Sequence, residues 1–459
     1  MGKKAALHNL GCKVNAYETE AMRQLLEEAG YEIVPFAPGA DVYVINTCTV
    51  TNIADRKSRQ MLHKAKKMNP DAIVVAAGCY VETAQNPPEE DSAVDLVLGN
   101  NQKGELVEAL RMFEETRRED LLEKEDTAEL DEIQPEPDKP FMKNNRISDI
   151  GHVREYENLS ITRTEEHTRA YIKVQDGCNQ FCTYCIIPYA RGRVRSRRTE
   201  DVLREVELLA QSGCREVVLT GIHLSSYGSD LGTSLISLIQ AVHAVPGIQR
   251  IRLGSLEPGI ITSEFAYALR ALPKVCPHFH LSLQSGCDSV LKRMNRRYTT
   301  AEFEEKCAML RETFDLPAIT TDVIVGFPQE TAEEFEETVA FLKRIRLYET
   351  HIFKYSMRQG TRAAAMAGQI PESEKGVRSD KLLALGEQNR TWFEEQQIGR
   401  PSEVLFEEKM QINGEEYFTG YTKEYIRAAI PASEDYTNQI LTGCLKQRIA
   451  SHVLLFDKI

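Results

Sequence analysis

The first 118 residues alternate between short apolar runs and longer runs in which apolar residues recur every three or four positions. The short runs predict strands and the longer runs predict amphipathic helices. We expect strands at 5–10, 42–45, 73–76 and 95–98, and helices at 18–28, 52–67 and 103–118. Because strands that alternate with helices form parallel sheets, residues 1–118 should fold as an α/β domain of Rossmann or flavodoxin type.

The same alternation resumes near residue 170 and continues to residue 355. Apolar runs at 170–174, 216–220, 250–254, 278–283, 318–324 and 350–355 predict six strands, with helices such as 199–212, 300–314 and 331–346 between them. Six strand–helix units predict a partial (β/α)6 barrel of TIM type, whose chemistry lies at the carboxyl ends of the strands. A doubly wound sheet is the alternative.

Two further segments have other patterns. After residue 397, short alternating runs at 402–406, 416–421, 426–430 and 449–456 are separated by turn signals and predict a small all-β barrel. Residues 113–140 hold twelve acids and four bases, with Pro135, Pro137 and Pro140 close together, which is typical of a linker or surface insertion. The expected α/β multidomain chain therefore divides at 1–118, 119–163, 164–396 and 397–459.

The overall composition adds little to this picture, whereas the position of the charged residues along the chain adds more. Hydrophobic residues make up 42% of the 459 positions and charged residues 27%, which is an ordinary globular balance. The net charge of −13 argues by itself against a nucleic-acid partner, but the acidic segment supplies more than half of it. No apolar run approaches the ~18 residues that span a bilayer, and no signal peptide follows Lys3, so we expect a cytoplasmic protein without a membrane partner.

Positive charge is concentrated in two places. Five arginines stand within eight residues, and their position directly after a cysteine cluster favours an anionic substrate or cofactor over a merely solvated surface. In the terminal segment, four aromatic residues lie among two basic ones, which suits base stacking beside a phosphate backbone unless the rings belong to the core. The expected RNA-binding residues are Arg191, Arg193, Arg195, Arg197 and Arg198 in the run and Lys423 and Arg427 in the terminal segment, with Tyr417, Phe418, Tyr421 and Tyr425 as the rings.

Eleven cysteines in a chain without secretion signals indicate metal or redox chemistry rather than disulfides. Cys178, Cys182 and Cys185 form a Cys-x3-Cys-x2-Cys triplet just after the first expected barrel strand. Three thiolates on one tight loop can hold three corners of a cubane iron–sulfur cluster and leave one iron open. Structural zinc would need a fourth ligand from elsewhere, such as Cys214 or a histidine.

A second set of cysteines is dispersed in the sequence. Cys12, Cys48 and Cys79 each stand just past one of the first three expected strands. Since ligands of open α/β sheets collect at the carboxyl edge, these three thiols should converge there. The remaining cysteines share no ligand spacing and are expected to be small buried hydrophobes, with Cys287 the first exception to consider; they are Cys214, Cys276, Cys287, Cys307 and Cys444.

The triplet in Gly177-Cys178-Asn179-Gln180-Phe181-Cys182-Thr183-Tyr184-Cys185 resembles the signature of radical S-adenosylmethionine enzymes. That resemblance implies a catalytic [4Fe–4S] cluster on Cys178, Cys182 and Cys185, whose open iron chelates S-adenosylmethionine. One electron from the cluster would then release a 5′-deoxyadenosyl radical, which abstracts hydrogen from carbon.

Motifs at the ends of later strands resemble the methylthiotransferase branch of the same superfamily. They are Thr220-Gly221-Ile222-His223, Gly254-Ser255-Leu256-Glu257-Pro258, Leu283-Gln284-Ser285-Gly286 and Asp322-Val323-Ile324-Val325-Gly326-Phe327-Pro328. The resemblance implies cofactor contacts, with helix capping and turn chemistry as the alternative for Ser255 and Gly326. The expected cofactor-binding residues are Tyr184, Gly221, Ser255, Glu257, Gln284, Asp322 and Gly326.

The amino-terminal domain resembles this branch too. Its motifs are Leu10-Gly11-Cys12-Lys13-Val14-Asn15, Asn46-Thr47-Cys48-Thr49-Val50-Thr51 and Ala77-Gly78-Cys79-Tyr80. They imply a second [4Fe–4S] cluster on Cys12, Cys48 and Cys79 where sulfur for insertion is held, and the final barrel looks like the TRAM domain of the family. The first motif and the segment 54–60 look like the group that acts on threonylcarbamoyl-adenosine, whereas the isopentenyl-adenosine group typically has Gly-Cys-Gln-Met-Asn.

The resemblance implies methylthiolation of carbon 2 of threonylcarbamoyl-adenosine at position 37 of transfer RNA. Two S-adenosylmethionine molecules would be used per product, one for the methyl group and one for the radical. The implied partners are the anticodon stem-loop of transfer RNA, an electron donor such as flavodoxin or ferredoxin, and a sulfur donor. Two alternatives stay open: another target, either isopentenyl-adenosine or a ribosomal-protein aspartate, and a non-catalytic iron–sulfur protein that binds RNA or acts as a sensor.

Overall fold

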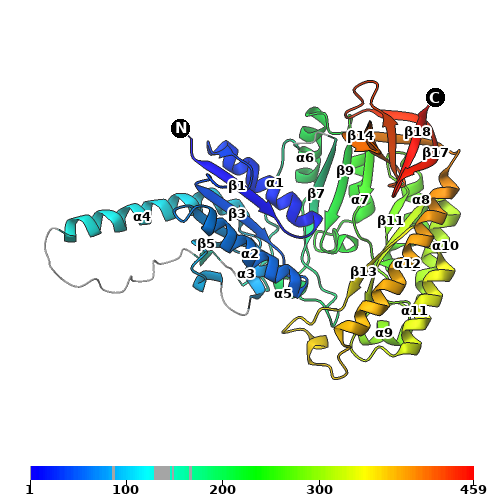
Figure 1. Ribbon diagram of the computed structural model, residues 1–459, viewed down its shortest axis with the longest axis horizontal. Helices are drawn as coiled ribbons and strands as arrows, with labels where there is room; N and C mark the ends of the chain where they lie inside the picture. The colour runs from blue at the N-terminus through cyan, green and yellow to red at the C-terminus, as the bar shows by residue number, and fades with distance from the viewer. Residues whose placement is uncertain (1, 85–87, 129–144, 147–148, 165–167) are drawn as a thin grey trace. The chain divides into compact units, whose positions relative to one another are not determined.

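The computed structural model describes residues 2–84, 88–128, 145–146, 149–164 and 168–459 (Figure 1). The chain forms two compact units. The first consists of Met1–Ile161, Asp176–Gln180 and Cys185–Arg195, and the second of Thr162–Gln175, Phe181–Tyr184 and Ser196–Ile459. The three prolines of the expected linker lie outside the described residues.

The first unit is built on a parallel sheet of strand order β2-β1-β3-β4-β5-β6 (blue to cyan in Figure 1). Its strands are β1 (Lys4–Asn9), β2 (Glu32–Ile33), β3 (Val42–Thr47), β4 (Ile73–Gly78), β5 (Leu96–Leu98) and β6 (Asn145–Arg146). Strands β3 and β4 are buried at every position because helices cover both faces, which explains their continuous apolar runs. The order 2-1-3-4-5 is that of flavodoxin, and its direction reverses between β1 and β3.

Helices cover the two faces of this sheet. Helices α1 (Lys13–Glu28) and α4 (Leu106–Ala128) pack on one face, and α2 (Asn52–Met68) covers the other. Shorter elements are α3 (Cys79–Thr83), η1 (Pro88–Glu90), η2 (Lys103–Glu105) and α5 (Ile187–Arg191). Helix α4 runs ten residues past its expected end at 118, into the expected linker, because residues 119–128 contain neither glycine nor proline.

The second unit contains the α/β barrel strands in chain order. They are β7 (Arg169–Asp176), β8 (Arg195–Ser196), β9 (Glu216–Gly221), β10 (Arg250–Leu253), β11 (His278–His280), β12 (Ala318–Val325) and β13 (Glu349–Lys354). Strands β7, β9 and β10 pair in parallel, as do β11, β12 and β13, and single bridges join β10 to the segment around β11. Sequential neighbours of this kind form a partial barrel, whereas a doubly wound sheet would reverse its order.

The helices that follow these strands are α6 (Thr199–Gln211), α7 (Leu235–Ala244), α8 (Ser263–Arg270), α9 (Asp288–Arg293), α10 (Thr300–Thr313), α11 (Ala332–Ile345) and α12 (Glu372–Gln397), with the short turns η3 (Leu224–Ser226), η4 (Pro258–Ile260) and η5 (Arg362–Ala365). The three helices expected from the sequence correspond to α6, α10 and α11, whose bounds match within two residues. Thr299 and Thr331 start α10 and α11 with capping boxes, which fixes where both helices begin. Within the described part of the chain, no helix is both long enough and apolar enough to cross a bilayer.

The carboxyl-terminal residues form a closed β-barrel of order β14-β15-β16-β18-β17 (red in Figure 1). Its strands are β14 (Pro401–Ile412), β15 (Glu415–Thr422), β16 (Arg427–Pro431), β17 (Ile440–Ala450) and β18 (Val453–Lys458). The expected single strand at 449–456 is wrong, since the chain turns at His452, whose φ is +59°, between β17 and β18. The polar residues of β17 interrupt its apolar alternation, which is why the sequence pattern missed it.

Within the second unit, the terminal barrel packs against the amino ends of the α/β barrel strands. Ala318, at the start of β12, joins one apolar cluster with Phe393 of α12 and Phe406 of β14. Beside this cluster, Glu216 opens β9 and is fully buried. Its carboxylate organises arginines that reach backbone carbonyls of the terminal barrel, so one acid contributes to holding the two barrels together.

Candidate functional site

The structure places the three dispersed cysteines as expected. Cys12 is the residue before α1, Cys48 directly follows β3, and Cys79 begins α3 directly after β4. These strands are neighbours in the sheet, so the thiols lie at one carboxyl edge, around the point where the strand order reverses. A Cβ added at Gly11, which has φ of +122°, would lie 3.2 Å from Cys48 Sγ, so glycine permits the close approach.

Buried polar side chains surround these thiols. Cys12 Sγ donates to Asn15 Oδ1 at 3.7 Å, whereas Asn100 Nδ2 donates to Cys79 Sγ at 3.7 Å. Arg191 Nε donates to Cys79 Sγ at 3.2 Å. Hydrogen-bond donors directed at sulfur are the usual surroundings of metal-ligating thiolates.

Without a metal, the thiols of Cys12 and Cys48 are protonated. Burial raises the pKa of the Cys48 thiol to about 11 and also raises the pKa of Cys12. Metal binding removes such protons, since a coordinating thiol is deprotonated outright. Three sulfur ligands at one sheet edge, with two side-chain donors directed at the sulfur of Cys79, therefore fit a cubane cluster with one open iron.

The second triplet occupies the loop between β7 and α5, as expected. In the first unit, Cys178 N donates to Gly192 O at 3.0 Å, and Gly177 has φ of +71°. A Cβ at Gly177 would lie 1.8 Å from Arg193 O, so no other residue fits this turn without moving the backbone. The loop that carries Cys178 and Cys185 is thus tied to the segment that follows α5.

In the second unit, Cys182 is hydrogen-bonded to an arginine that the sequence did not single out. Arg296 Nη1 donates to Cys182 Sγ at 3.3 Å, and its Nη2 donates to Glu257 Oε2 at 2.5 Å. Tyr298 OH accepts from Arg296 Nε at 3.0 Å and donates to Leu283 O at 2.8 Å. Glu257 was expected to bind the cofactor, and here it links the sulfur-binding arginine to the strand-end loops.

The other expected cofactor residues lie at strand ends, but not all of them face open space. Gln284, with φ of +68°, bridges to β12, where its N donates to Asp322 O at 2.8 Å. A Cβ at Gly221 would meet Gln175 Oε1 at 2.8 Å, and one at Gly326 would meet Lys375 Cγ at 2.3 Å. These two glycines accommodate the protein's own side chains, which is a structural reason for glycine at both positions. Ser255 is exposed, and Tyr184 packs beside Phe327 and Cys287.

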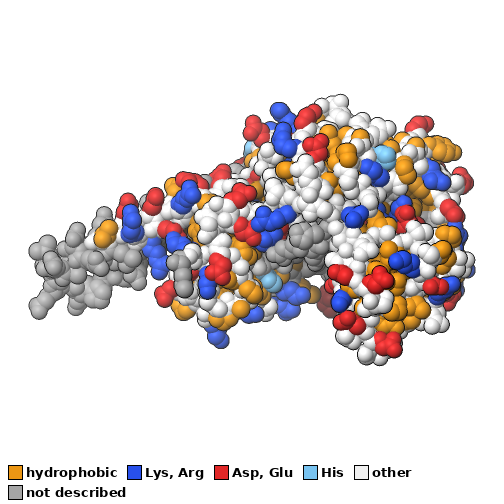
Figure 2. Space-filling model, turned by 90° about the horizontal axis from the view of Figure 1, so that it is seen from above, with side chains coloured by type: hydrophobic (Ala, Val, Ile, Leu, Met, Phe, Trp, Pro, Cys, Tyr) orange, Lys and Arg blue, Asp and Glu red, His pale blue; other side chains and the backbone are white. Residues whose placement is uncertain are grey.

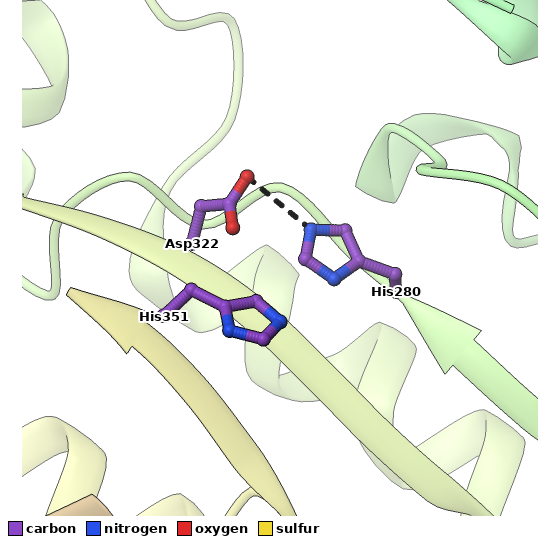
Figure 3. A group of neighbouring side chains, drawn as sticks. All are labelled: His280, Asp322 and His351. Atoms are coloured by element: carbon purple, nitrogen blue, oxygen red, sulfur yellow. Dashed lines mark ion pairs between the residues drawn. The ribbon is translucent and has the colours of Figure 1, made fainter. Parts of the chain in front are cut away.

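Asp322 lies beside His280 and His351 in a cluster of polar side chains that was not predicted from the sequence (Figure 3). His280 Nε2 lies 3.4 Å from Asp322 Oδ2, and the His280 and His351 rings are stacked 5.7 Å apart. His280 Nδ1 hydrogen-bonds Thr320 Oγ1 at 3.0 Å, which fixes the ring. The group presents nitrogen and carboxylate ligand atoms within 4.8 Å of one another, on adjacent strands β11, β12 and β13.

Three of the five arginines that were expected to contact RNA are buried in ion pairs. Arg191, Arg195 and Arg197 are at most 2% exposed, and they form ion pairs with Glu18, Asp176 and Glu205. Buried guanidinium groups need such carboxylates, because an unpaired charge inside a protein is costly. Arg193 and Arg198 are exposed. On the face seen in Figure 2, basic and acidic side chains are interspersed rather than segregated.

The residues of the terminal barrel that were expected to bind RNA differ in their surroundings. Phe418 belongs to the core, while Tyr421 and Tyr425 stack on each other with ring centroids 4.6 Å apart. The Arg169 guanidinium lies over both rings, at 5.1 and 5.2 Å, so their faces are already occupied. Lys423 Nζ pairs with Glu403 at 2.8 Å, and Arg427 pairs with Glu408 at 2.9 Å; Tyr417 packs beside the smaller apolar cluster of the barrel.

The cysteines without expected roles are mostly buried, as predicted. Cys214, Cys276, Cys287 and Cys307 are buried, and Cys444 is half-buried. Cys214 precedes β9, at the opposite end of that strand from the catalytic edge, so it is not placed to complete a zinc site with the triplet. Cys287 Sγ donates to Glu337 Oε2 at 2.9 Å.

Comparison with known proteins agrees with this geometry. The model of the radical SAM superfamily matches residues 172–342, and that of the family described as "Uncharacterized protein family UPF0004" matches residues 4–99. The chain resembles the solved radical S-adenosylmethionine methyltransferase TsrM from Kitasatospora setae with a TM-score of 0.55 and 18% identity, over 77% of this chain and 75% of that one, which is a likeness of fold. The partial barrel and its cysteine triplet thus define a radical S-adenosylmethionine protein.

Comparison with curated proteins assigns the chain to a narrower family within this superfamily. The threonylcarbamoyladenosine tRNA methylthiotransferase MtaB of Bacillus subtilis is 40% identical over 95% of this chain and 92% of the relative. The protein of the same name from Aquifex aeolicus is 40% identical over 90% and 95%. The chain belongs to the methylthiotransferase family of radical S-adenosylmethionine enzymes.

Proposed function

We propose that this protein is a transfer-RNA methylthiotransferase that modifies carbon 2 of threonylcarbamoyl-adenosine at position 37. The observation that carries the proposal is the occurrence of two cysteine triplets, each at the carboxyl edge of its own parallel sheet. The curated relatives, which match over nearly the whole chain, support the choice of substrate. The target nucleoside follows from their names and from the first cysteine motif.

In this proposal, Cys178, Cys182 and Cys185 hold a [4Fe–4S] cluster whose open iron takes S-adenosylmethionine. The bound cluster supplies one electron and thereby the carbon-centred radical chemistry of the superfamily. Arg296 holds Cys182 by a charge-assisted hydrogen bond and is itself held by Glu257, so the ligand is oriented before cofactor arrives. Tyr184, Ser255, Gln284 and Asp322 surround the same strand ends and would contact the cofactor or the base.

The second cluster would be held by Cys12, Cys48 and Cys79, with its open iron available for the sulfur that is transferred. Two S-adenosylmethionine molecules serve each product, and the partners include an electron donor and a sulfur donor. For RNA, the exposed Arg193 and Arg198 and the terminal barrel, which we assign as a TRAM domain, supply positive charge at Lys423 and Arg427.

The decisive experiment separates the two triplets. Replacing Cys178, Cys182 and Cys185 by Ala in the reconstituted protein should abolish reductive cleavage of S-adenosylmethionine. Replacing Cys12, Cys48 and Cys79 by Ala should leave 5′-deoxyadenosine formation intact while removing the methylthio product, measured by nucleoside mass spectrometry. The control is Cys214→Ala, which should retain both activities. If the amino-terminal variant made methylthio-adenosine at the wild-type rate, that cluster would be structural and the proposed mechanism would fail.

The choice of substrate has its own test. Transfer RNA from a strain that lacks the gene should accumulate threonylcarbamoyl-adenosine without the methylthio group, and the gene should restore it. Accumulation of unmodified isopentenyl-adenosine instead would identify the other nucleoside as the target. A protein that binds RNA but never cleaves S-adenosylmethionine would be the non-catalytic alternative.

A further inference from the structure

Arg191 is buried in the first unit and is saturated with hydrogen bonds. Its Nε donates to Cys79 Sγ at 3.2 Å, its Nη1 to Glu18 at 2.7 Å and to Asp176 at 3.2 Å, and its Nη2 to Glu18 at 3.0 Å and to Asn15 at 2.7 Å. A guanidinium has five N–H groups, and these contacts use all of them. The side chain is 0% exposed, so its direction is fixed by the fold.

The partners of Arg191 belong to a buried network of charged side chains. Lys103 Nζ pairs with Glu18 at 3.0 Å, and Arg195 lies 3.7 Å from Asp176. The ion pairs of this network join three buried cations to two carboxylates, and the Glu82 carboxyl interacts with the same three cations. Besides these carboxylates, Arg191 faces the sulfur of Cys79, to which its Nε donates. When Cys79 ligates a metal its sulfur is a thiolate, so Arg191 then gives that ligand a charge-assisted hydrogen bond.

The backbone around Arg191 explains how it reaches this sulfur. Arg191 ends α5, six residues after Cys185, the last cysteine of the other triplet. Gly192 follows with φ of +68°, and a Cβ there would lie 2.1 Å from Ile150 O, so the chain turns at a position only glycine allows. The segment after one cysteine triplet is thereby fixed so that its arginine meets a ligand of the other.

A cation and a hydrogen bond at a cluster thiolate favour the reduced, more negative state of the cluster. We propose that Arg191 is a positioning residue for the amino-terminal cluster, which orients Cys79 as a ligand and raises the reduction potential of that cluster. This inference rests on the proposed function, because it requires a cluster on Cys12, Cys48 and Cys79. It assigns to Arg191 a role that its expected contact with RNA did not include.

The test measures the midpoint potential of the amino-terminal cluster alone. The full-length chain with Cys178, Cys182 and Cys185 replaced by Ala is reconstituted anaerobically and titrated, with the reduced cluster followed by electron paramagnetic resonance. In this background, Arg191→Gln should make the potential more negative, by at least a tenfold change in the reduced-to-oxidised ratio at a fixed potential, which equals about 59 mV for one electron. Arg191→Lys, which keeps the charge but not the fork of donors, should give a smaller shift.

A second variant should shift the midpoint potential of the cluster in the opposite direction. Glu18→Gln removes a negative charge that Arg191 and Lys103 share, so it should make the potential less negative. If the two substitutions only disturbed the structure, they would not be expected to shift the potential in opposite directions. The matched control is Arg23→Gln on the same helix as Glu18, whose ion pairs with Glu20 and Glu27 lie away from the sulfurs and whose loss should leave the potential unchanged.

The outcomes are distinguishable. Opposite shifts in Arg191→Gln and Glu18→Gln support the proposal, as does a cluster that is lost in Arg191→Gln but kept in Arg191→Lys. Equal potentials in wild type, Arg191→Gln and Glu18→Gln overturn the proposal while leaving the two-cluster function standing. If the background protein binds no cluster at all, there is no signal to titrate, and the proposed function fails together with the proposal.

Discussion

Replacing Glu216 by Gln should loosen the attachment of the terminal barrel. Glu216 is fully buried, and its carboxylate lies 2.9 Å from Arg169 Nε, 2.9 Å from Arg252 Nε and 3.8 Å from Arg250 Nη1. Arg250 in turn donates to the carbonyls of Tyr421 and Glu403, both at 2.8 Å. A neutral amide would leave these arginines buried without their shared counter-ion.

The size of the effect follows from two arguments. Removing one partner of a buried ion pair costs about 3–5 kcal/mol, because the remaining charge is uncompensated. Burial alone would raise the pKa of Glu216, but Arg252 and Arg169 outweigh burial and lower it from 4.5 to about 2. At ~1.4 kcal/mol per pH unit, that difference corresponds to about 3 kcal/mol of stability at neutral pH.

The lowered pKa of Glu216 also determines how the stability of the protein changes with pH. Because the pKa is lower in the folded protein, the unfolded chain binds more protons at acid pH. The contribution of Glu216 is therefore complete above about pH 4.5 and is lost as the pH falls toward about 2. The Gln variant should lack this acid-dependent part of the stability.

Urea unfolding of the anaerobic protein at pH 7 measures the free-energy change, and limited proteolysis reports whether residues 397–459 separate. The matched control is Glu304→Gln, whose surface pair with Arg344 at 2.9 Å is largely exposed and should change stability by less than about 1 kcal/mol. If Glu216→Gln costs no more than this control, the backbone carbonyls alone hold the arginines, and the reasoning from charge is refuted.

Three further predictions concern the clusters and the RNA. Anaerobic reconstitution should reach about eight irons per chain, the content of two [4Fe–4S] clusters, and saturation at four irons with zinc at the other site would contradict the two-cluster proposal. Gly177→Ala should reduce bound iron by about half, since its Cβ would lie 1.8 Å from Arg193 O, while Gly376→Ala, with its nearest contact at 3.6 Å, should bind iron like the wild type. Deleting residues 397–459 from a chain that stays folded should weaken transfer-RNA affinity and reduce its salt dependence without stopping S-adenosylmethionine cleavage; unchanged affinity would return Tyr421 and Tyr425 to a purely structural role.

Much of the fold could be predicted from the sequence, because it depends on local patterns of apolar residues and on where the strands end. Strands β3 and β4 are buried on both faces, so their apolar runs stood out, and the rule that ligands collect at carboxyl edges was enough to bring Cys12, Cys48 and Cys79 together. Strand β17 was missed because the alternation of its side chains is interrupted by Lys446, Gln447 and Arg448. These three side chains are exposed, so their polarity gives no sign of the strand.

The surroundings of the sites could not be predicted, because they depend on partners far away in the chain. The arginine run looked like a solvated or RNA-binding surface, yet Arg191 meets Glu18, 173 residues earlier. Arg296 meets Cys182 across 114 residues, and no local pattern marks that contact. A cluster of charge in a sequence gives its sign but not which side chains face inward, since that depends on where the compensating acids come to lie.

Strand β12 runs between the terminal barrel and the region around the triplet loop. It begins at Ala318, within the apolar cluster of the terminal barrel, and ends beside Phe327, which packs in the same group as Tyr184 of the triplet loop. Eight residues of extended chain measure about 26 Å. A free nucleoside bound near Tyr184 is too short to touch the terminal barrel as well, so that barrel can contribute affinity only for a polymer. We therefore expect its removal to weaken binding of transfer RNA and to leave binding of a free nucleoside unchanged.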